Sequence, residues 1–246
     1  RDADRVVSML PKVQDYMASR GLDLRKLHIV PNGITLDEWQ GDGEALRDDV
    51  AAAIAQQRRA GRVVVGYAGS MGLPNALDVL IDAVKLLQDE STGTEFGIVM
   101  VGDGLERERL VQRLHGLGLQ DRMVWLPPIA KAQVPAFLAQ LDIAYIGWQR
   151  VPIYRFGIAP NKLMDYLMAR CVVLHSVDAG NDPVAESGCG LTVPPESPAD
   201  VAAGLRALAA LPEAERRAMG ERGRAFVLAN HTYPVLAQRF IQSLQP

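Results

Sequence analysis

A lysine in the first turn of a predicted helix is the side chain of this sequence best placed to bind an anion. Residues 160–166 read Pro-Asn-Lys-Leu-Met-Asp-Tyr, and the proline near the start favours a helix over residues 160–169. A cation at a helix N-terminus opposes the helix dipole and costs roughly a few tenths of a kcal/mol. That cost is understandable if Lys162 and the free N–H groups of the helix share an anion such as a phosphate.

Asp165 follows Lys162 by three residues and lies on the same face of the predicted helix. A carboxylate beside a phosphate site suits the two hydroxyls of a ribose, as in other nucleotide sites. We therefore predict that one helix start binds both the phosphate and the ribose of a nucleotide. An ion pair on the surface of an ordinary helix is the alternative that this pattern leaves open.

Glycine-containing turns follow two predicted strands. Residues 69–72 read Gly-Ser-Met-Gly, and small residues there let the backbone approach a ligand near a helix N-terminus. The turn matches neither Gly-x-Gly-x-x-Gly nor a Walker loop, so a tight turn that needs small residues is an equal alternative. Residues 102–104 read Gly-Asp-Gly, and for them we predict only a turn in which Asp103 is the N-cap of the next helix.

Other site chemistries find little support in the sequence. The four histidines, His28, His115, His175 and His231, are scattered, and none pairs with a cysteine or carboxylate at metal-ligand spacing, so we expect no metal site. No serine stands in a nucleophile elbow. Lys162 could form a Schiff base, but nothing else in the sequence points to pyridoxal phosphate.

The composition is that of an ordinary globular protein. Of the 246 residues 48% are hydrophobic and 22% charged, and the net charge of −3 gives no indication of a nucleic-acid partner. Two cysteines, Cys171 and Cys189, do not make a disulfide framework, so we expect a cytoplasmic protein. No apolar run approaches the ~20 residues that a membrane span needs. Because the sequence opens at Arg1 on polar, helix-like text, we expect it to be a fragment of a longer protein.

Apolar strands alternate with amphipathic helices along most of the chain. This alternation predicts an α/β protein with a Rossmann-like parallel sheet and helices on both faces, and its ligands bind beyond the carboxyl ends of the strands. Strands are predicted at residues 63–68, 97–101, 123–126, 142–146, 172–175 and 190–193. Helices are predicted at residues 73–89, 105–117, 132–141, 160–169, 197–211, 213–229 and 233–244.

The first residues have the character of a different unit. A helix over residues 12–20 and a strand over residues 27–30 precede a polar helix at residues 42–61. We assign residues 1–34 to the remnant of an N-terminal domain, 35–61 to a linker and helix, and 62–230 to the Rossmann-like domain. Residues 231–246 would form a helix that returns toward the N-terminal domain.

Aromatic residues mark the fourth strand of the main sheet and the loop after it. Tyr145, Trp148, Tyr154 and Phe156 fall within this stretch of chain. Such a loop is not a simple solvated connector, so it either packs on the neighbouring domain or lines the ligand site. Both interpretations fit a cleft, and the sequence does not separate them.

In their order and spacing, these motifs carry a resemblance over nearly the whole chain. The chain resembles the C-terminal half of glycosyltransferase family 4, which has the GT-B fold. The similar segments are residues 29–34 (Ile-Val-Pro-Asn-Gly-Ile), 65–69 (Val-Gly-Tyr-Ala-Gly), 75–80 (Asn-Ala-Leu-Asp-Val-Leu), 99–104 (Val-Met-Val-Gly-Asp-Gly), 126–129 (Leu-Pro-Pro-Ile) with Val134, 141–143 (Leu-Asp-Ile), 160–169, 188–193 (Gly-Cys-Gly-Leu-Thr-Val) and 231–233 (His-Thr-Tyr).

The resemblance implies a retaining transfer of a sugar from a nucleotide-sugar donor, usually without a bound metal. Side chains and helix N-termini would stabilise the phosphates, residues 126–129, Val134 and residues 141–143 would cradle the base, and acceptor specificity would lie in the N-terminal domain. The expected partners are the donor, a glycan or lipid-linked acceptor and the missing N-terminal domain. That domain could bring the protein to the inner membrane face.

The sequence departs from the family pattern at two places. Many members carry Glu-x7-Glu here, in which the first Glu contacts the donor sugar and the second the ribose; Asp165 takes the second position, but Gly157 takes the first. Many members also carry an Arg and a Lys in the first glycine loop, at the positions of Ser70 and Asn75. In a subgroup that this helix resembles better, which includes aminosugar transferases of bacterial O-antigen and capsule assembly, Lys162 would take over the phosphate role.

Our leading hypothesis is therefore the donor-binding half of a glycosyltransferase that uses a nucleotide-sugar, with UDP as the expected nucleotide. It would build surface polysaccharide, and the fragment alone would be inactive. A degenerate nucleotide-binding module and a GT-B nucleotide-sugar epimerase are the alternatives. We assign catalysis to Lys162, with Arg155 as a second phosphate candidate, and donor binding to Gly69, Ser70, Met71, Gly72, Asn75, Pro128, Ile129, Val134, Gly157, Ile158, Asn161, Lys162 and Asp165.

Overall fold

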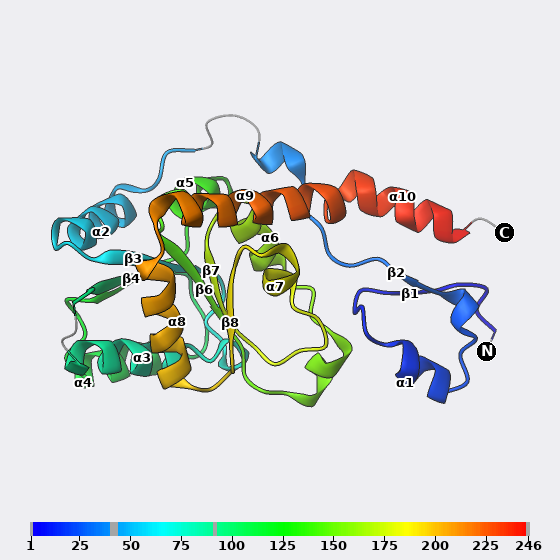
Figure 1. The fold of residues 1–246 in the computed structure, drawn as a ribbon, viewed down its shortest axis with the longest axis horizontal. Helices are drawn as coiled ribbons and strands as arrows, with labels where there is room; N and C mark the ends of the chain where they lie inside the picture. Colours follow the sequence, from blue (N-terminus) through cyan, green and yellow to red (C-terminus); the bar gives the residue numbers. More distant parts are fainter. Residues whose placement is uncertain (1, 40–43, 91–92, 245–246) are drawn as a thin grey trace.

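A six-stranded parallel sheet forms the centre of the protein (Figure 1). The computed structural model describes residues 2–39, 44–90 and 93–244. Within them, the sheet has the strand order β5-β4-β3-β6-β7-β8. Its strands are β3 (Val63–Ala68), β4 (Phe96–Val101), β5 (Met123–Leu126), β6 (Ile143–Gly147), β7 (Val173–Ser176) and β8 (Gly190–Val193).

Helices pack on both faces of this sheet, as the alternating apolar pattern predicted. On one face, α3 (Leu77–Glu90), α4 (Arg107–Gly116) and α8 (Pro198–Ala210) pack on the sheet and form one hydrophobic core with it. The second hydrophobic core lies between the sheet and five other helices, which are α2 (Asp48–Arg59), α5 (Val134–Leu138), α6 (Asn161–Met168), α7 (Pro183–Ser187) and α9 (Glu213–Asn230). The Rossmann-like fold predicted from the sequence is confirmed.

The strand order changes direction between β3 and β6. From β3 the chain adds β4 and β5 on one side, and then crosses to β6, β7 and β8 on the other. In open α/β sheets, the crevice at such a switch point is the usual place for a ligand. The ladder between β3 and β6 contains only Val65–Ile143 and Gly66–Ala144, so the two strands separate toward their carboxyl ends.

Residues before the main sheet form a second, two-stranded parallel sheet. It contains β1 (Val6–Ser8) and β2 (Leu27–Ile29), with α1 (Gln14–Ser19) and the 3-10 helix η1 (Leu24–Lys26) between them. α10 (Tyr233–Leu244) continues beyond α9 on the side of the molecule where β1 and β2 lie (Figure 1). Arg5 there donates from Nε to the carbonyl oxygen of Ser243, at 2.9 Å. That residues 1–34 belong to an N-terminal domain remains a prediction.

Several element boundaries differ from the predicted ones. The helix predicted from residue 73 begins at Leu77, because residues 73–75 form the 3-10 helix η3 (Leu73–Asn75) and Ala76 has a left-handed φ of 46°. The helix predicted at residues 132–141 is a 3-10 turn, η4 (Lys131–Gln133), followed by the short α5. Of the helix predicted at residues 42–61, residues 42–43 lie outside the described residues, and α2 covers only part of the rest.

Two short elements, β1 and α7, were not predicted, and one predicted cap is wrong. Asp103 does not cap α4, whose N-cap position is Glu106 and has no side-chain cap; its Oδ1 instead accepts a hydrogen bond from the N–H of Gly104, at 2.8 Å. By contrast, Ser197 caps α8 as expected, because its Oγ accepts from the N–H of Asp200. Among the described residues, no helix is both long and apolar enough to cross a membrane.

Candidate functional site

A pocket of about 400 Å³ lies at the switch point of the sheet. Its walls come from the turns after β3, β4 and β5 and from one face of α6. The lining residues are Ala68, Gly69, Ser70, Val101, Gly102, Asp103, Pro128, Ile129, Lys131, Val134, Lys162, Asp165 and Tyr166. We call this the switch-point pocket.

Tyr166 attaches α6 to the end of β3. Its hydroxyl accepts a hydrogen bond from the N–H of Ala68 at 2.9 Å and lies 3.3 Å from the carbonyl oxygen of the same residue, to which it can donate. The side chain is buried, and burial raises the pKa of its hydroxyl well above the usual value. This contact fixes the first turn of α6 beside the glycine turn.

Lys162 extends from α6 across the pocket floor to that turn. Its ammonium donates to the hydroxyl of Tyr67 and to Oδ1 of Asn75, both at 2.7 Å. The Tyr67 hydroxyl donates onward to the carbonyl oxygen of Ser70. The ammonium also lies 4.6 Å from the centre of the Tyr67 ring and 6.0 Å from that of Trp148. All these partners are neutral.

Within the described part of the chain, Lys162 forms no ion pair. It is partly buried, and burial lowers the pKa of its ammonium to about 8. A shielded cation without a carboxylate partner is unfavourable, and an anion that reaches it relieves this penalty. The ion pair between Lys162 and Asp165, which the sequence left open, does not form.

Gly69 leaves room for this ammonium. Its φ is +145°, and a Cβ there would lie 3.3 Å from Nζ of Lys162. A larger residue would be strained by this φ, and its Cβ would crowd the end of the lysine side chain. The close approach therefore explains why a glycine follows β3.

Asp165 pairs with Lys131, a residue for which the sequence predicted no role. Nζ of Lys131 lies 2.7 Å from both carboxylate oxygens of Asp165. The carboxylate is 14% exposed. Burial raises the pKa of Asp165, and the hydrogen bonds from Lys131 oppose that rise.

The structure brings seven of the predicted donor-binding residues together around the switch-point pocket. They are Gly69, Ser70, Pro128, Ile129, Val134, Lys162 and Asp165. The others lie elsewhere. Met71 is buried below the turn, Asn75 contacts the pocket only through Lys162, and Gly72, Gly157, Ile158 and Asn161 do not line it. Their roles as ligands stay predictions, as do those of the seven.

Arg155 and the aromatic residues of the loop after β6 lie outside the lining of the switch-point pocket. Arg155 is exposed, does not line the switch-point pocket, and stacks over Phe156 at 4.5 Å. Phe156 packs against Tyr16 of α1, with ring centroids 5.1 Å apart, whereas Trp148 faces Lys162. Phe156 thus packs on the segment before the main sheet and Trp148 lies near the Lys162 ammonium, while the role of the loop stays a prediction.

Gly157 cannot carry the carboxylate that the family pattern has at its position. Its φ of +95° and ψ of 173° lie in a region that only glycine adopts freely. A Cβ there would lie 2.5 Å from Cδ of Pro11 and 2.8 Å from Oδ1 of Asn181. The residue is therefore specified by the backbone path and the neighbouring chain.

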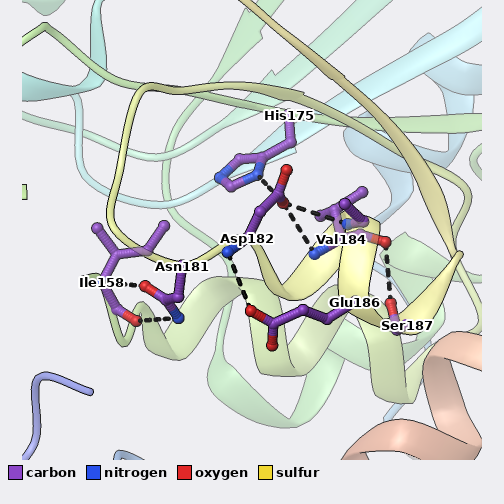
Figure 2. Close-up of polar contacts among 8 residues, drawn as sticks. Ile158, His175, Asn181, Asp182, Val184, Glu186 and Ser187 are labelled. Atoms are coloured by element: carbon purple, nitrogen blue, oxygen red, sulfur yellow. Dashed lines mark hydrogen bonds and ion pairs between the residues drawn. The ribbon is translucent and has the colours of Figure 1, made fainter. Parts of the chain in front are cut away.

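The loop after β7 fixes this path from one side. Figure 2 shows Asn181 in a two-point contact with the backbone of Ile158: its Oδ1 accepts from the N–H at 2.7 Å, and its Nδ2 donates to the carbonyl oxygen at 3.2 Å. The next residue, Asp182, points toward His175 at the end of β7, with 3.2 Å between Oδ1 and Nδ1.

Asp182 also caps α7 by accepting from the N–H groups of Val184 and Ala185. The pKa of Asp182 lies at about 2, because burial raises it less than the hydrogen bonds from His175 and Thr192 lower it. Asn181, which holds Ile158, is thus followed directly by a residue that is itself bonded to β7 and α7. Among the described residues, no three His, Cys, Asp or Glu side chains gather in an arrangement that could hold a metal ion.

Comparison with known proteins agrees with this architecture. The family model for glycosyl transferases group 1 matches residues 62–210, which is more than half of the chain. The chain belongs to the group 1 glycosyltransferases. It is similar to the D-inositol 3-phosphate glycosyltransferases of Salinispora tropica (28% identity over 231 residues, 90% of this chain and 46% of that protein) and Geodermatophilus obscurus (27% over 218 residues, 85% and 46%). This glycosyltransferase chain thus spans about half the length of the curated relatives it matches.

Solved structures show the same fold. Anabaena HepE in complex with UDP-glucose superposes with a TM-score of 0.74 at 16% identity, over 99% of this chain and 64% of that one. WaaG, a glycosyltransferase involved in lipopolysaccharide biosynthesis, gives a TM-score of 0.69 at 16% identity, over 98% and 63%. At these identities the likeness shows the GT-B type of Rossmann-like domain, and the roles of individual residues in this glycosyltransferase must come from its own geometry.

The conformation at Gly157 is directly testable. We expect Gly157→Ala to lower the free energy of unfolding by about 1–3 kcal/mol, because the new Cβ forces a strained φ and displaces Pro11 or Asn181. Urea unfolding followed by circular dichroism measures this difference. Gly116→Ala is the matched control: Gly116 ends α4 with nothing within 4 Å of an added Cβ, so that substitution should be neutral or stabilising. If both substitutions changed the free energy of unfolding equally, the backbone at Gly157 would not require a glycine.

Proposed function

We propose that this chain is the donor-binding part of a glycosyltransferase that uses a UDP-sugar, and that the nucleotide binds in the switch-point pocket. The observation that carries the proposal is the Lys162 ammonium, which faces the glycine turn with only neutral partners. A diphosphate at this point would supply the missing negative charge. Charge-assisted hydrogen bonds of this type are the strong ones in proteins.

The position of Lys162 also accounts for the cations absent from the glycine loop. Its Nζ lies 2.7 Å from Oδ1 of Asn75, at one of the two positions where many family members carry a loop cation. A lysine that arrives from α6 can therefore hold its charge where a loop lysine would otherwise hold it. This supports a phosphate role for Lys162, and the exposed Arg155 has no comparable support.

The other parts of a nucleotide find matching surfaces in the same pocket. Pro128, Ile129 and Val134 provide an apolar wall after β5, which suits a flat base. Asp165 lines the same pocket as this wall and Lys162, so ribose hydroxyls can donate to its carboxylate. UDP has a base, a ribose and a diphosphate to match these three surfaces. The presence of UDP-glucose in the solved Anabaena structure of the same fold favours UDP over other nucleotides.

The pocket can assist sugar transfer through electrostatics. When the sugar–phosphate bond breaks, negative charge grows on the diphosphate oxygens, and a fixed ammonium nearby stabilises it. Lys162 is held by Tyr67 and Asn75, so little reorganisation is needed at that moment. We propose that this stabilisation needs no metal ion and that transfer retains the anomeric configuration, as the family resemblance implies.

We propose a glycan or lipid-linked acceptor in cell-surface polysaccharide synthesis. This acceptor rests on the resemblance of residues 160–169 to transferases of O-antigen and capsule assembly, and so does peripheral binding at the inner membrane face. A nucleotide-binding module without catalysis is the second candidate. The observation that favours it is Gly157, where the backbone excludes the carboxylate that many members use on the donor sugar.

Removing the charge of Lys162 should weaken nucleotide binding. We expect Lys162→Met to raise the Kd for UDP about 10- to 150-fold, because a charge-assisted hydrogen bond contributes about 1.5–3 kcal/mol. Isothermal titration calorimetry on the chain measures this. Lys85→Met is the control, since Lys85 lies on α3 in an ion pair with Asp89, outside the switch-point pocket. An unchanged Kd for Lys162→Met would show that the phosphate binds elsewhere.

The pH dependence of UDP binding should follow the titration of Lys162. In the free protein its pKa is about 8, and a bound diphosphate raises it. Above pH 8 the complex therefore binds more protons than the free protein, so affinity falls as the pH rises, by up to about tenfold per pH unit. Titrations between about pH 7.5 and 9 measure this slope. Lys162→Arg, which keeps its charge, should bind with little change over that range, and a steep fall in that variant would assign the titration to another group.

We also expect the chain to bind UDP without transferring sugar. The family resemblance implies a catalytic apparatus that spans the cleft between two domains, and the chain spans about half the length of its curated relatives. A panel of UDP-sugars with glycan and lipid-linked acceptors, assayed for released UDP, tests this. Transfer above the uncatalysed rate would refute the expectation.

A further inference from the structure

The ion pair between Lys131 and Asp165 separates two pockets. Both residues line the switch-point pocket, and both also line a smaller pocket formed with Gly33, Ile34, Thr35, Glu38, Asn161 and Tyr233. The pair thus stands where the nucleotide pocket meets the segment between β2 and α2. The proposed function uses only Asp165 and leaves Lys131 without a role.

Charged groups reach Asp165 from several elements. Lys131 comes from η4, and its Nζ bonds both carboxylate oxygens at 2.7 Å. Glu38, from the 3-10 helix η2 (Leu36–Trp39), lies 3.6 Å from the same ammonium. Lys162 precedes Asp165 by three residues on α6, and Asp103 lines the same pocket from the turn after β4.

The geometry leaves room for a ribose. A carboxylate accepts about four hydrogen bonds, and Lys131 uses one position on each oxygen of Asp165. The remaining positions can take two hydroxyl donors only while the group is ionised, because a protonated carboxyl gives up one acceptor position to its own proton. Glu38 forms a second, longer ion pair with the same ammonium.

We propose that Lys131 is a positioning residue of the ribose subsite, which orients the ionised carboxylate of Asp165 toward both ribose hydroxyls and so selects ribonucleotides over 2′-deoxyribonucleotides. The inference rests on the proposed function of the switch-point pocket. Burial and Glu38 both raise the pKa of Asp165, and Lys131 is the group that opposes them. Without Lys131 the carboxyl would take up a proton at a higher pH.

An ordinary surface ion pair would behave differently. Such a pair contributes little to stability and has no reason to affect the choice between two nucleotides. Here Lys131 is 54% exposed, whereas Asp165 is only 14% exposed. The ammonium therefore reaches in from solvent to a shielded carboxylate, and its replacement leaves the core intact.

The test compares the Kd values of UDP and 2′-deoxy-UDP for the same chain at about pH 5.5 and pH 8. Titration of the diphosphate itself affects both nucleotides equally, so the ratio of the two Kd values isolates the ribose contact. We expect 2′-deoxy-UDP to bind at least about tenfold more weakly to the wild type at both pH values, as for one lost hydrogen bond to a charged group. In Lys131→Met this ratio should fall below about threefold at both pH values, because the carboxylate is no longer oriented toward the hydroxyls, and the fall should be larger at pH 5.5, because the pKa of Asp165 is higher without Lys131.

Two further variants make the result specific. Lys131→Arg should restore the wild-type ratio at both pH values, because it keeps a charged donor. Lys85→Met, which removes another lysine from an ion pair, should leave the ratio unchanged. Urea unfolding of each variant confirms that the folded chain is compared.

Several results would overturn the inference. A wild-type ratio in Lys131→Met at both pH values would show that Lys131 does not position Asp165. An equal loss of affinity for both nucleotides would show that Lys131 contacts the base or phosphate. A wild type that binds UDP without discrimination would refute the ribose subsite alone, whereas a wild type that binds neither nucleotide would refute the proposed function itself.

Discussion

The hydroxyl of Tyr166 bonds the backbone of Ala68, and the site depends on this contact. β3 pairs with β6 only as far as Gly66, although it pairs with β4 up to Ala68. The last backbone groups of β3 therefore face the opening between the strands without a strand partner on that side. Tyr166 supplies the missing hydrogen bonds. The divergence that opens the pocket is thus also what attaches α6 to its edge.

Lys162 precedes Tyr166 by four residues, one helical turn, so both side chains project from the same face of α6. Once Tyr166 is bonded to Ala68, the ammonium of Lys162 must lie beside the glycine turn, where Tyr67 and Asn75 receive it. A cation in a first turn is unfavourable for the helix itself. Its position is explained by the pocket in front of it.

The sequence predicted both ends of each of the six strands of the main sheet to within one residue, because buried parallel strands are apolar runs that glycines and polar turns interrupt. The start of α3 was missed because local pattern does not reveal that Ala76 adopts a left-handed conformation. α7 was missed because it has only five residues, too few for a helical period. Such features depend on neighbours in space, which a window of sequence does not contain.

The sequence also predicted only part of the site. Lys162 and Asp165 stand out because their types and spacing are local to one helix. Lys131 does not, since its partner lies 34 residues away and meets it only when η4 folds against α6. The sequence shows only that Lys131 is a lysine in the turn after β5. Lysines in such turns are commonly solvated, so this position alone does not indicate a site residue.

The backbone around Gly157 is held from two sides and leaves no room for a side chain at this position. Asn181 holds Ile158 from one side, and from the other the N–H of Lys12 donates to the carbonyl oxygen of Phe156 at 2.9 Å. Asn32 donates to the carbonyl oxygen of Ala159 at 2.8 Å. The path into α6 is therefore fixed jointly by the Rossmann-like domain and by residues 11–32. A side chain at position 157 would have to displace Pro11 or Asn181, so the absence of the family's first Glu is tied to the contact between residues 11–32 and the Rossmann-like domain. Any displacement of residues 11–32 would in turn act on the loop that leads to Lys162.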